Sequence, residues 1–377
     1  MSEKQKKVIV ITSIVVGALI LLSVAGTFGY SSYLKNKTSD KKVVEQSASE
    51  EPAQTPLPTP TKDPHEGKVQ SSLNGKWVEP SVENKRPFAI MINNIEYAFN
   101  HQCGVSKADI VYEALAEGGI TRMMAVYQDV SDVKRIGSVR SARHYYVQFA
   151  YEWDAIFCHF GQTKYAIWKM NHLGTQNLSG LSAIGPVVYA RDSSIHAPHN
   201  VFTSGAKMKK GAKKLKYSLK KREGKQAEHF RFNEKNTEPE SDKDATKITI
   251  PFSNYSTCTM KYNAKKKKYM KYEYGTKHMD SYYKKQLAFD NVIIQIVEES
   301  NKDHNGYQTM AIANNSGKGY YFSDGKQVRI TWERKGSGSS IKMVYRDESG
   351  ETLTVNPGKT YIAVYPKSRK KLISVKS

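Results

Sequence analysis

Residues 108–127 read ADIVYEALAEGGITRMMAVY, two apolar runs separated by Gly118-Gly119. The first run begins with Asp109-Ile-Val-Tyr-Glu113. The second, Arg122-Met-Met-Ala-Val-Tyr127, is short, apolar and bounded by turn residues, which is typical of a buried strand. We therefore expect this stretch to lie in the core of the first folded part of the chain.

The segments around this stretch alternate between strand and helix patterns. Apolar runs predict strands at Phe88–Ile92 and at Ala155–Phe160, the latter ending before Gly161. Helical periodicity predicts helices over Ser141–Trp153 and Thr163–Met170. This alternation predicts an α/β (α+β) domain over residues 81–217.

The C-terminal part of the chain is rich in strand patterns punctuated by Gly and Asn. Turn signals occur at Asp347-Glu-Ser-Gly350 and Asn356-Pro-Gly358. We predict a mostly antiparallel β domain over residues 218–377. Its expected strands are Lys247–Pro251, Thr257–Asn263, Met270–Tyr274, Val292–Val297, Val328–Trp332, Ile341–Arg346 and Tyr361–Tyr365.

The N-terminal segment Val8–Gly29 contains no charged residue. A helix of this length covers roughly 30 Å, the thickness of a bilayer core. Lysines precede it, so residues 1–7 are predicted to stay in the cytoplasm and the rest of the chain to be extracytoplasmic. The alternative is a signal peptide cleaved near Ala25, but the apolar run is longer than the usual signal segment.

Residues 30–80 are predicted to be a disordered linker. They are rich in Lys, Glu, Ser and Thr, with five prolines between Pro52 and Pro64. Such a composition cannot bury enough apolar surface to fold. The three cysteines, Cys103, Cys158 and Cys258, have no metal-site or disulfide spacing, so we expect isolated core residues.

The net charge of +22 is concentrated in the C-terminal half. Residues 201–377 hold 37 basic and 18 acidic residues, which gives +19. A basic surface outside the membrane would meet anionic wall polymers and lipid headgroups rather than nucleic acid. The alternative interpretation is simple solvation of lysine-rich loops.

Two acidic and two basic residues of the first domain are candidates for chemistry. Glu113 and Glu117 share a face, and would be ~5–6 Å apart in a helix but ~13 Å apart in a strand. Arg140 and Arg143 would face one way near the start of the helix that Ser138 or Ser141 could cap. There they could hold a phosphate or carboxylate, or form an internal salt-bridge network.

Histidines supply the remaining candidates. His159 is expected at the carboxyl end of a strand, where ligands bind in open α/β sheets. Residues 191–200, RDSSIHAPHN, are expected to form a functional loop carrying Arg191, His199 and Asn200. The His196 to His199 spacing alone is a weak metal signal, so no metal and no cofactor are predicted.

Several longer motifs resemble the YerB-like family of uncharacterised cell-envelope proteins of Gram-positive bacteria. They include RPFAIMINN, GVSKADIVYEALAEGGITRMMAVYQD, IGSVRSAR, APHN, YGTKHMD and NPGKTYIAVYP. The resemblance implies two domains over about residues 86–366 and implies no established activity. Some members are described as lipoproteins, whereas this chain has no lipidation cysteine after its apolar segment. The motifs carry Glu113, Glu117, Arg122, Arg140, Arg143, His199, Asn200, His278 and Asp280.

These observations predict a single-pass membrane protein that binds an anionic cell-wall component or peptidoglycan. The predicted ligand-binding residues are Arg122, Arg140, Arg143, Arg191, His199 and Asn200. One alternative is an enzyme on peptidoglycan or a phosphorylated wall precursor, with Glu113, Glu117 and His159 as acid–base groups. The other is a scaffold for other wall proteins. The sequence leaves the oligomeric state open.

Overall fold

The computed structural model describes residues 63–224, 229–336 and 342–377, and Lys62–Ser377 form one compact unit. The predicted cytoplasmic tail, the anchor at residues 8–29 and the linker up to residue 62 lie outside the described residues. Within the described ranges, no helix is both long and apolar enough to cross a membrane. The membrane anchor therefore remains a prediction from the sequence.

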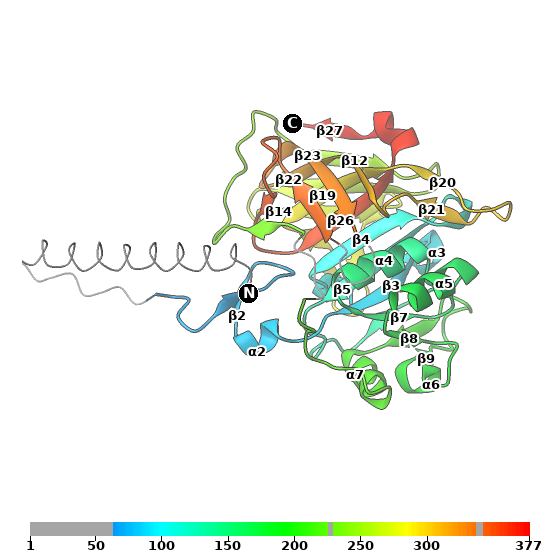
Figure 1. Cartoon of the computed structure of the whole chain (residues 1–377). Helices are drawn as coiled ribbons and strands as arrows, with labels where there is room; N and C mark the ends of the chain where they lie inside the picture. The colour runs from blue at the N-terminus through cyan, green and yellow to red at the C-terminus, as the bar shows by residue number, and fades with distance from the viewer. Residues whose placement is uncertain (1–62, 225–228, 337–341) are drawn as a thin grey trace, which may run out of the picture. The chain divides into compact units, whose positions relative to one another are not determined.

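A ten-stranded mixed sheet forms the centre of this unit (Figure 1). It draws five strands from each half of the chain, and these pair without interruption. In spatial order they are β24 (Lys342–Arg346), β23 (Lys326–Lys335), β22 (Asn315–Ser323), β19 (Asn291–Val297), β26 (Thr360–Pro366), β4 (Ile110–Leu115), β5 (Thr121–Tyr127), β3 (Phe88–Asn94), β7 (Ile156–His159) and β8 (Asn177–Ser179).

The two halves of the chain meet in the middle of this sheet. Strand β26 pairs in parallel with β4, and on its other edge with β19. Strand β5 runs antiparallel to both β3 and β4, so β3, β4 and β7 run in one direction. The boundary predicted between residues 217 and 218 thus separates two segments whose strands are hydrogen-bonded to each other.

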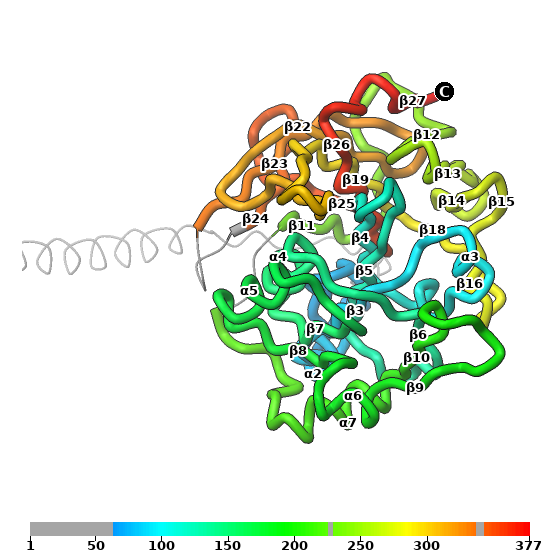
Figure 2. The backbone as a smooth tube through the Cα atoms, turned by 90° about the vertical axis from the view of Figure 1, so that its right-hand side faces the viewer, coloured from blue at the N-terminus to red at the C-terminus, as the bar shows by residue number. Residues whose placement is uncertain are grey.

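Different layers cover the two faces of strands β3, β4 and β5 (Figure 1; Figure 2). Helices α4 (His144–Glu152) and α5 (Lys164–Leu173) lie on one face, where Tyr145, Tyr146 and Phe149 of α4 are buried. A second, six-stranded sheet lies on the other face. It consists of β15 (Thr276–Lys277), β14 (Lys268–Glu273), β13 (Thr257–Asn263), β12 (Lys247–Pro251) and β27 (Ser374–Lys376), with β18 (Ala288–Phe289) paired to β14.

The remaining elements are short. A three-stranded sheet contains β6 (Ile136–Gly137), β10 (Val201–Thr203) and β9 (Ala190–Arg191), and helix α7 (Gly205–Lys214) follows it. The other pairs are β1 (Val69–Gln70) with β2 (Trp77–Val78), β11 (Arg231–Phe232) with β25 (Thr354–Val355), β16 (Met279–Asp280) with β17 (Lys285–Gln286), and β20 (Glu299–Asn301) with β21 (Gln308–Met310). The other helices are α2 (Pro80–Glu83), α3 (Glu96–Phe99), α6 (Gly185–Val188) and the 3-10 turns η1 (Val105–Lys107), η2 (Glu117–Gly119) and η4 (Lys367–Leu372).

The α/β character of the first part and the β-rich character of the second agree with the sequence analysis. The second part is mostly antiparallel, and β19 pairs with β26, and β11 with β25, in parallel. Order begins earlier than the predicted end of the linker, because β1 and β2 form a hairpin closed around buried Leu73. All three cysteines are buried free thiols, as expected.

Candidate functional site

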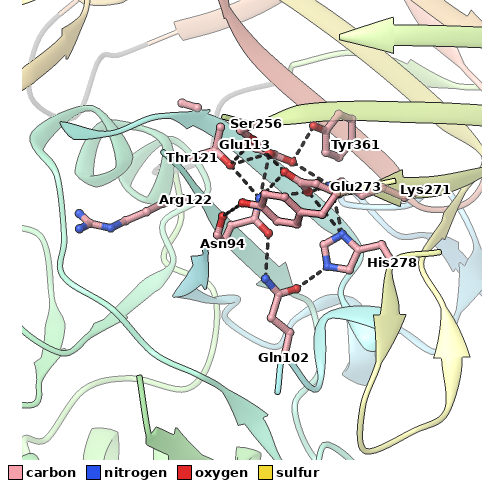
Figure 3. Close-up of polar contacts among 12 residues, drawn as sticks. Asn94, Gln102, Glu113, Thr121, Arg122, Ser256, Lys271, Glu273, His278 and Tyr361 are labelled. Atoms are coloured by element: carbon pink, nitrogen blue, oxygen red, sulfur yellow. Dashed lines mark hydrogen bonds and ion pairs between the residues drawn. The ribbon is translucent and has the colours of Figure 1, made fainter. Parts of the chain in front are cut away.

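Two polar clusters lie on opposite faces of strand β5. Successive side chains of a strand point to opposite faces, so Thr121 and Arg122 diverge. Thr121 joins a buried network under the six-stranded sheet, whereas Arg122 points away from that network (Figure 3). The side chains of neighbouring β3 also alternate between the two faces: Asn94 pairs with Thr121, and Asn93 pairs with Arg122.

Lys271 is the centre of the buried network. Its ammonium group lies 3.2 Å from Glu113 Oε2, donates to Glu273 Oε2 and donates to His278 Nδ1 at 3.1 Å. Strand β4 supplies Glu113, and β14 supplies Lys271 and Glu273, so the contacts join the two sheets. Other groups complete the hydrogen bonding: Asn94, Gln102, Thr121, Ser256 and Tyr361 (Figure 3).

Burial sets the charge state of this network. Burial and the neighbouring Glu273 raise the pKa of Glu113 to about 7. Burial alone would raise the pKa of Glu273, but Lys271 and His278 outweigh it and hold that pKa well below its usual range. Burial and Lys271 lower the pKa of His278 to about 4, so its imidazole is neutral. Below neutral pH, where Glu113 is mostly protonated, the network therefore centres on one Lys271–Glu273 ion pair.

The network has the properties of a structural connection between sheets. Glu113, Lys271 and His278 are completely buried, and the principal surface cavities are lined by other residues. A substrate could not reach these groups without separating the sheets. The role predicted for Glu113 as an acid–base group is not supported by this position.

The second cluster begins with Glu117, which follows β4. Arg143 Nε donates to Glu117 Oε1 at 2.6 Å, and its Nη2 donates to the other carboxylate oxygen. Arg122 Nη1 lies 3.9 Å from the same carboxylate and donates to the carbonyl of Ser141 at 3.2 Å. Glu117 thus contacts two arginines, and bidentate pairing satisfies only Arg143.

Residues 137–143 form an extended segment over the carboxyl ends of β3 and β7. Arg140 N–H donates to Met91 O, and Ala142 N–H donates to Gly161 O. Glycines permit close packing of this segment: a Cβ on Gly161 would lie 2.6 Å from Ser141 Oγ, and one on Gly137 would lie 2.8 Å from Val201 O of β10. The helix predicted to begin at Ser141 begins at His144 in the structure, after this extended segment. Its N-cap is Arg143, so the predicted caps Ser138 and Ser141 are wrong.

Arg140, Arg191 and His199 form the outer part of the second cluster. Arg140 Nη1 donates to Pro198 O at 3.2 Å. Arg191 donates to Asn200 Oδ1 at 2.7 Å and lies over the Phe160 ring at 5.0 Å. His199 Nδ1 lies 2.9 Å from Asn93 Nδ2. We call Arg122, Arg140, Arg143 and Arg191 the arginine cluster.

The four guanidinium groups are close enough to perturb one another. Burial, and then the charge of Arg143, lower the pKa of Arg122 to about 10. Burial lowers the pKa of Arg140, and Arg143 and Arg191 lower it further. Burial and Arg140 also lower the pKa of His199. Among the residues that the structure describes, Glu117 supplies the one carboxylate in contact with these arginines, so the positive charges exceed the negative ones.

Two nitrogens of the arginine cluster are buried without a partner. Among the described residues, neither Arg122 Nε nor Arg140 Nε has a hydrogen-bond acceptor. A buried, unsatisfied donor costs about 1–3 kcal/mol, and more when the group is charged. An anion that enters the cluster could recover part of this cost.

His159 lies apart from both clusters. It is completely buried in β7, with Nδ1 2.9 Å from Gly161 O and Nε2 3.2 Å from Asn177 Oδ1. Burial lowers the pKa of His159, so the imidazole is neutral. The three predicted acid–base groups, Glu113, Glu117 and His159, therefore occupy three separate environments.

The structure brings together all six residues predicted to bind a ligand: Arg122, Arg140, Arg143, Arg191, His199 and Asn200. Sequence reasoning missed Asn93, which links His199 to the sheet, and it missed Lys271 and Glu273. In the part of the chain described above, no group of three or more His, Cys, Asp and Glu side chains is arranged to hold a metal ion.

Comparisons with known proteins place this chain in a family. Two family models match, described as the N-terminal and C-terminal domains of "Protein of unknown function (DUF3048)", over residues 73–218 and 248–362. The chain is 31% identical over 301 residues to "Putative lipoprotein YerB" of Bacillus subtilis (strain 168), covering 79% of this chain and 87% of that protein. The crystal structure of Bacillus subtilis YerB superposes with a TM-score of 0.71 at 28% identity, covering 82% of this chain and all of that one.

Proposed function

We propose that this chain, which belongs to the DUF3048 family that includes YerB, is a membrane-associated envelope protein. We further propose that it binds an anionic cell-wall component at the arginine cluster. The membrane association rests on the lipoprotein description of the relative and on the apolar segment at residues 8–29. The binding role rests on the chemistry of the site.

The observation that carries this proposal is the proximity of four guanidinium groups, of which two, those of Arg122 and Arg143, contact a carboxylate, that of Glu117. Arginines that only stabilise a fold are normally matched by carboxylates or carbonyl oxygens. Here Arg122 Nε and Arg140 Nε are unmatched among the described residues. Phosphate and carboxylate groups are the anions that guanidinium groups bind best.

The cluster has an inner and an outer part. Arg122 and Arg143 are 4% and 7% exposed, so they contribute mainly through their charge. Arg140 is half-buried and Arg191 is exposed, so these two can contact a ligand directly. His199 lies beside them as a neutral hydrogen-bonding group at pH 7.

The excess charge of the C-terminal half supports the same function. A surface with +19 over residues 201–377 attracts polyanions over a distance of about a Debye length, ~8–10 Å at physiological salt. This attraction is unspecific, whereas the arginine cluster offers donors in fixed directions. We therefore propose that the basic surface of the C-terminal half attracts the polyanion, and that the arginine cluster recognises its anionic groups.

The enzyme alternative has less support than binding. It requires acid–base groups beside the bound anion, but Glu113 and His159 are buried elsewhere. Glu117 is bound to Arg143, and Arg143 lowers the pKa of Glu117 against the opposing effect of burial. A carboxylate held ionised in this way is a poor proton donor at pH 7.

Sedimentation with purified cell walls tests the proposal. The Arg140→Ala/Arg191→Ala variant removes two outer guanidinium groups, and Lys265→Ala/Lys266→Ala removes the same charge from an exposed turn between β13 and β14. We expect wall binding to fall at least tenfold in the arginine variant and to stay within about twofold in the lysine variant. Equal losses in both variants would mean that only net charge matters, and the proposal would then fail.

A further inference from the structure

A surface cavity of about 560 Å³ lies next to the arginine cluster. Its walls come from β9, β10, the start of α7 and the loop before β6. The cavity includes four cationic side chains: Lys134, Arg135, Arg191 and Lys207. Asp192 is the single carboxylate in its lining, so the lining carries a formal excess of three positive charges.

The Asp192 carboxylate is already engaged. Arg135 donates to Asp192 Oδ2 at 2.6 Å, and Ser194 donates to its other oxygen. The guanidinium of Arg135 also lies 3.9 Å over the Phe202 ring. The ammonium groups of Lys134 and Lys207 therefore provide most of the charge available to a ligand in this cavity.

The first turn of α7 adds to the positive potential. Ser204 caps this ten-residue helix by accepting from the backbone N–H of Lys207. Both residues line the cavity, so the positive end of the helix dipole is directed into it. The cavity thus combines lysines with a helix N-terminus, two features that favour phosphate.

Arg191 connects the cavity to the arginine cluster. It lines the cavity, and its charge also lowers the pKa of Arg140. The backbone makes the same connection, because β10 pairs with β9 at Arg191 and with β6 at Gly137, where the segment that carries Arg140 begins. The two positive sites are therefore adjacent parts of one surface.

We infer that the ligand is a linear polymer with phosphodiester groups at repeated intervals, and that it occupies the arginine cluster and this cavity at the same time. This inference rests on the proposed function and specifies its ligand. A single phosphorylated headgroup would use one site and leave the other empty. A polymer fills both, and its second contact then forms at a high effective concentration.

The hollow shape of the site favours a polymer over a bilayer surface, although the side chains of Lys134, Lys207 and Arg191 are themselves exposed. Lysines that bind a membrane lie on a convex or flat face and contact many headgroups at once. Here the lysines line a cavity. In the neighbouring arginine cluster, the inner residues Arg122 and Arg143 are buried. A thin, flexible polymer chain can enter the cavity, whereas a flat array of lipid headgroups cannot.

Calorimetric titration of the full chain in detergent with glycerol 3-phosphate and with glycerol phosphate oligomers of increasing length tests this inference. We expect affinity per chain to rise on the order of a hundredfold once an oligomer reaches both sites. Lys134→Ala/Lys207→Ala should remove this gain and leave one monomer site. Arg140→Ala should weaken both monomer and oligomer, and Lys265→Ala/Lys266→Ala should change neither.

The possible outcomes separate the two proposals. If monomer binds in an Arg140-dependent way and oligomers bind no tighter, the polymer inference fails and the proposed function stands. If the wild type binds neither monomer nor purified walls, both fail. Equal binding of a polygalacturonate chain, or binding of phosphatidylglycerol vesicles that depends on Lys134 and Lys207, would overturn the phosphodiester polymer as the ligand.

Discussion

Substituting Glu113 by Gln is expected to change how the stability of the protein depends on pH. Glu113 is completely buried, and its pKa is raised from 4.5 to about 7 by burial and by Glu273. The folded state therefore holds a proton on Glu113 that the unfolded state releases above about pH 4.5. The stabilisation that this proton gives is complete below pH 4.5 and is lost as pH rises through about 7.

The size of the effect follows from the shift. One pKa unit corresponds to about 1.4 kcal/mol, so at pH 8 ionising Glu113 costs the fold about 3 kcal/mol relative to a neutral side chain. At pH 5 the same cost is about 1 kcal/mol. The Gln side chain of the Glu113→Gln variant is neutral at every pH. The free energy of unfolding of the variant, relative to that of the wild type, should therefore rise by roughly 2 kcal/mol from pH 5 to pH 8.

Urea denaturation of both proteins at pH 5 and pH 8 measures this difference. The quantity of interest is the change in the free energy of unfolding between the two pH values, compared between variant and wild type. The exposed Glu298, replaced by Gln, is the control and should give a difference within about 0.5 kcal/mol. A Glu113→Gln difference near zero between pH 5 and pH 8 would show that the pKa of Glu113 is not raised in the fold and would refute this reasoning.

Three further outcomes are expected. Lys271→Met should lower the free energy of unfolding by about 3–5 kcal/mol in urea denaturation, because it leaves buried Glu273 without its cation, whereas Lys266→Met on the surface should be nearly neutral. A fragment that ends at residue 224 should give no cooperative unfolding transition by circular dichroism, because β4 loses its partner β26; a native-like transition would support independent domains. Wall binding should weaken steeply toward 1 M salt, where the Debye length is about 3 Å, and binding unchanged by salt would contradict an electrostatic site.

Local patterns were sufficient to predict most of the strands of five or more residues. The predicted bounds Lys247–Pro251 and Thr257–Asn263 coincide with β12 and β13, because alternating burial leaves a clear pattern in the sequence. Strand β22 was missed because its glycines resemble turn signals. In the structure Gly317 and Gly319 are packing positions, where a Cβ would lie 2.6 Å from Trp332 and 2.3 Å from Ile294 O.

Pairing between distant strands could not be predicted. No local pattern indicates that β26 lies beside β4, so the single sheet across both halves was not expected. Helix α7 was also missed, because its lysines and glycines mask the buried face formed by Met208, Gly211 and Ala212. These features depend on tertiary contacts rather than on local sequence preference.

The candidate site could be predicted from the sequence only in part. The three-residue spacing of Arg140 and Arg143 near the start of a helix indicated these arginines, and the four-residue spacing from Glu113 indicated Glu117. Lys271 was hidden, since it follows the lysine run at residues 265–268 and looks like solvated surface. Its burial depends on alternation within β14, which places Lys271 and Glu273 on the covered face against Glu113.

Arginine Nε–Hε resonances, followed by NMR during a titration with glycerol 3-phosphate, test the binding role of the arginine cluster most directly. Resonances assigned by single substitutions should shift for Arg140 and Arg191, saturate together, and leave the distant, exposed Arg329 unchanged. The shift of Arg191 should disappear in the Arg140→Ala variant, while wall binding falls in parallel. Shifts that are absent, or that grow linearly for all exposed arginines alike, would contradict a specific anion site at this cluster.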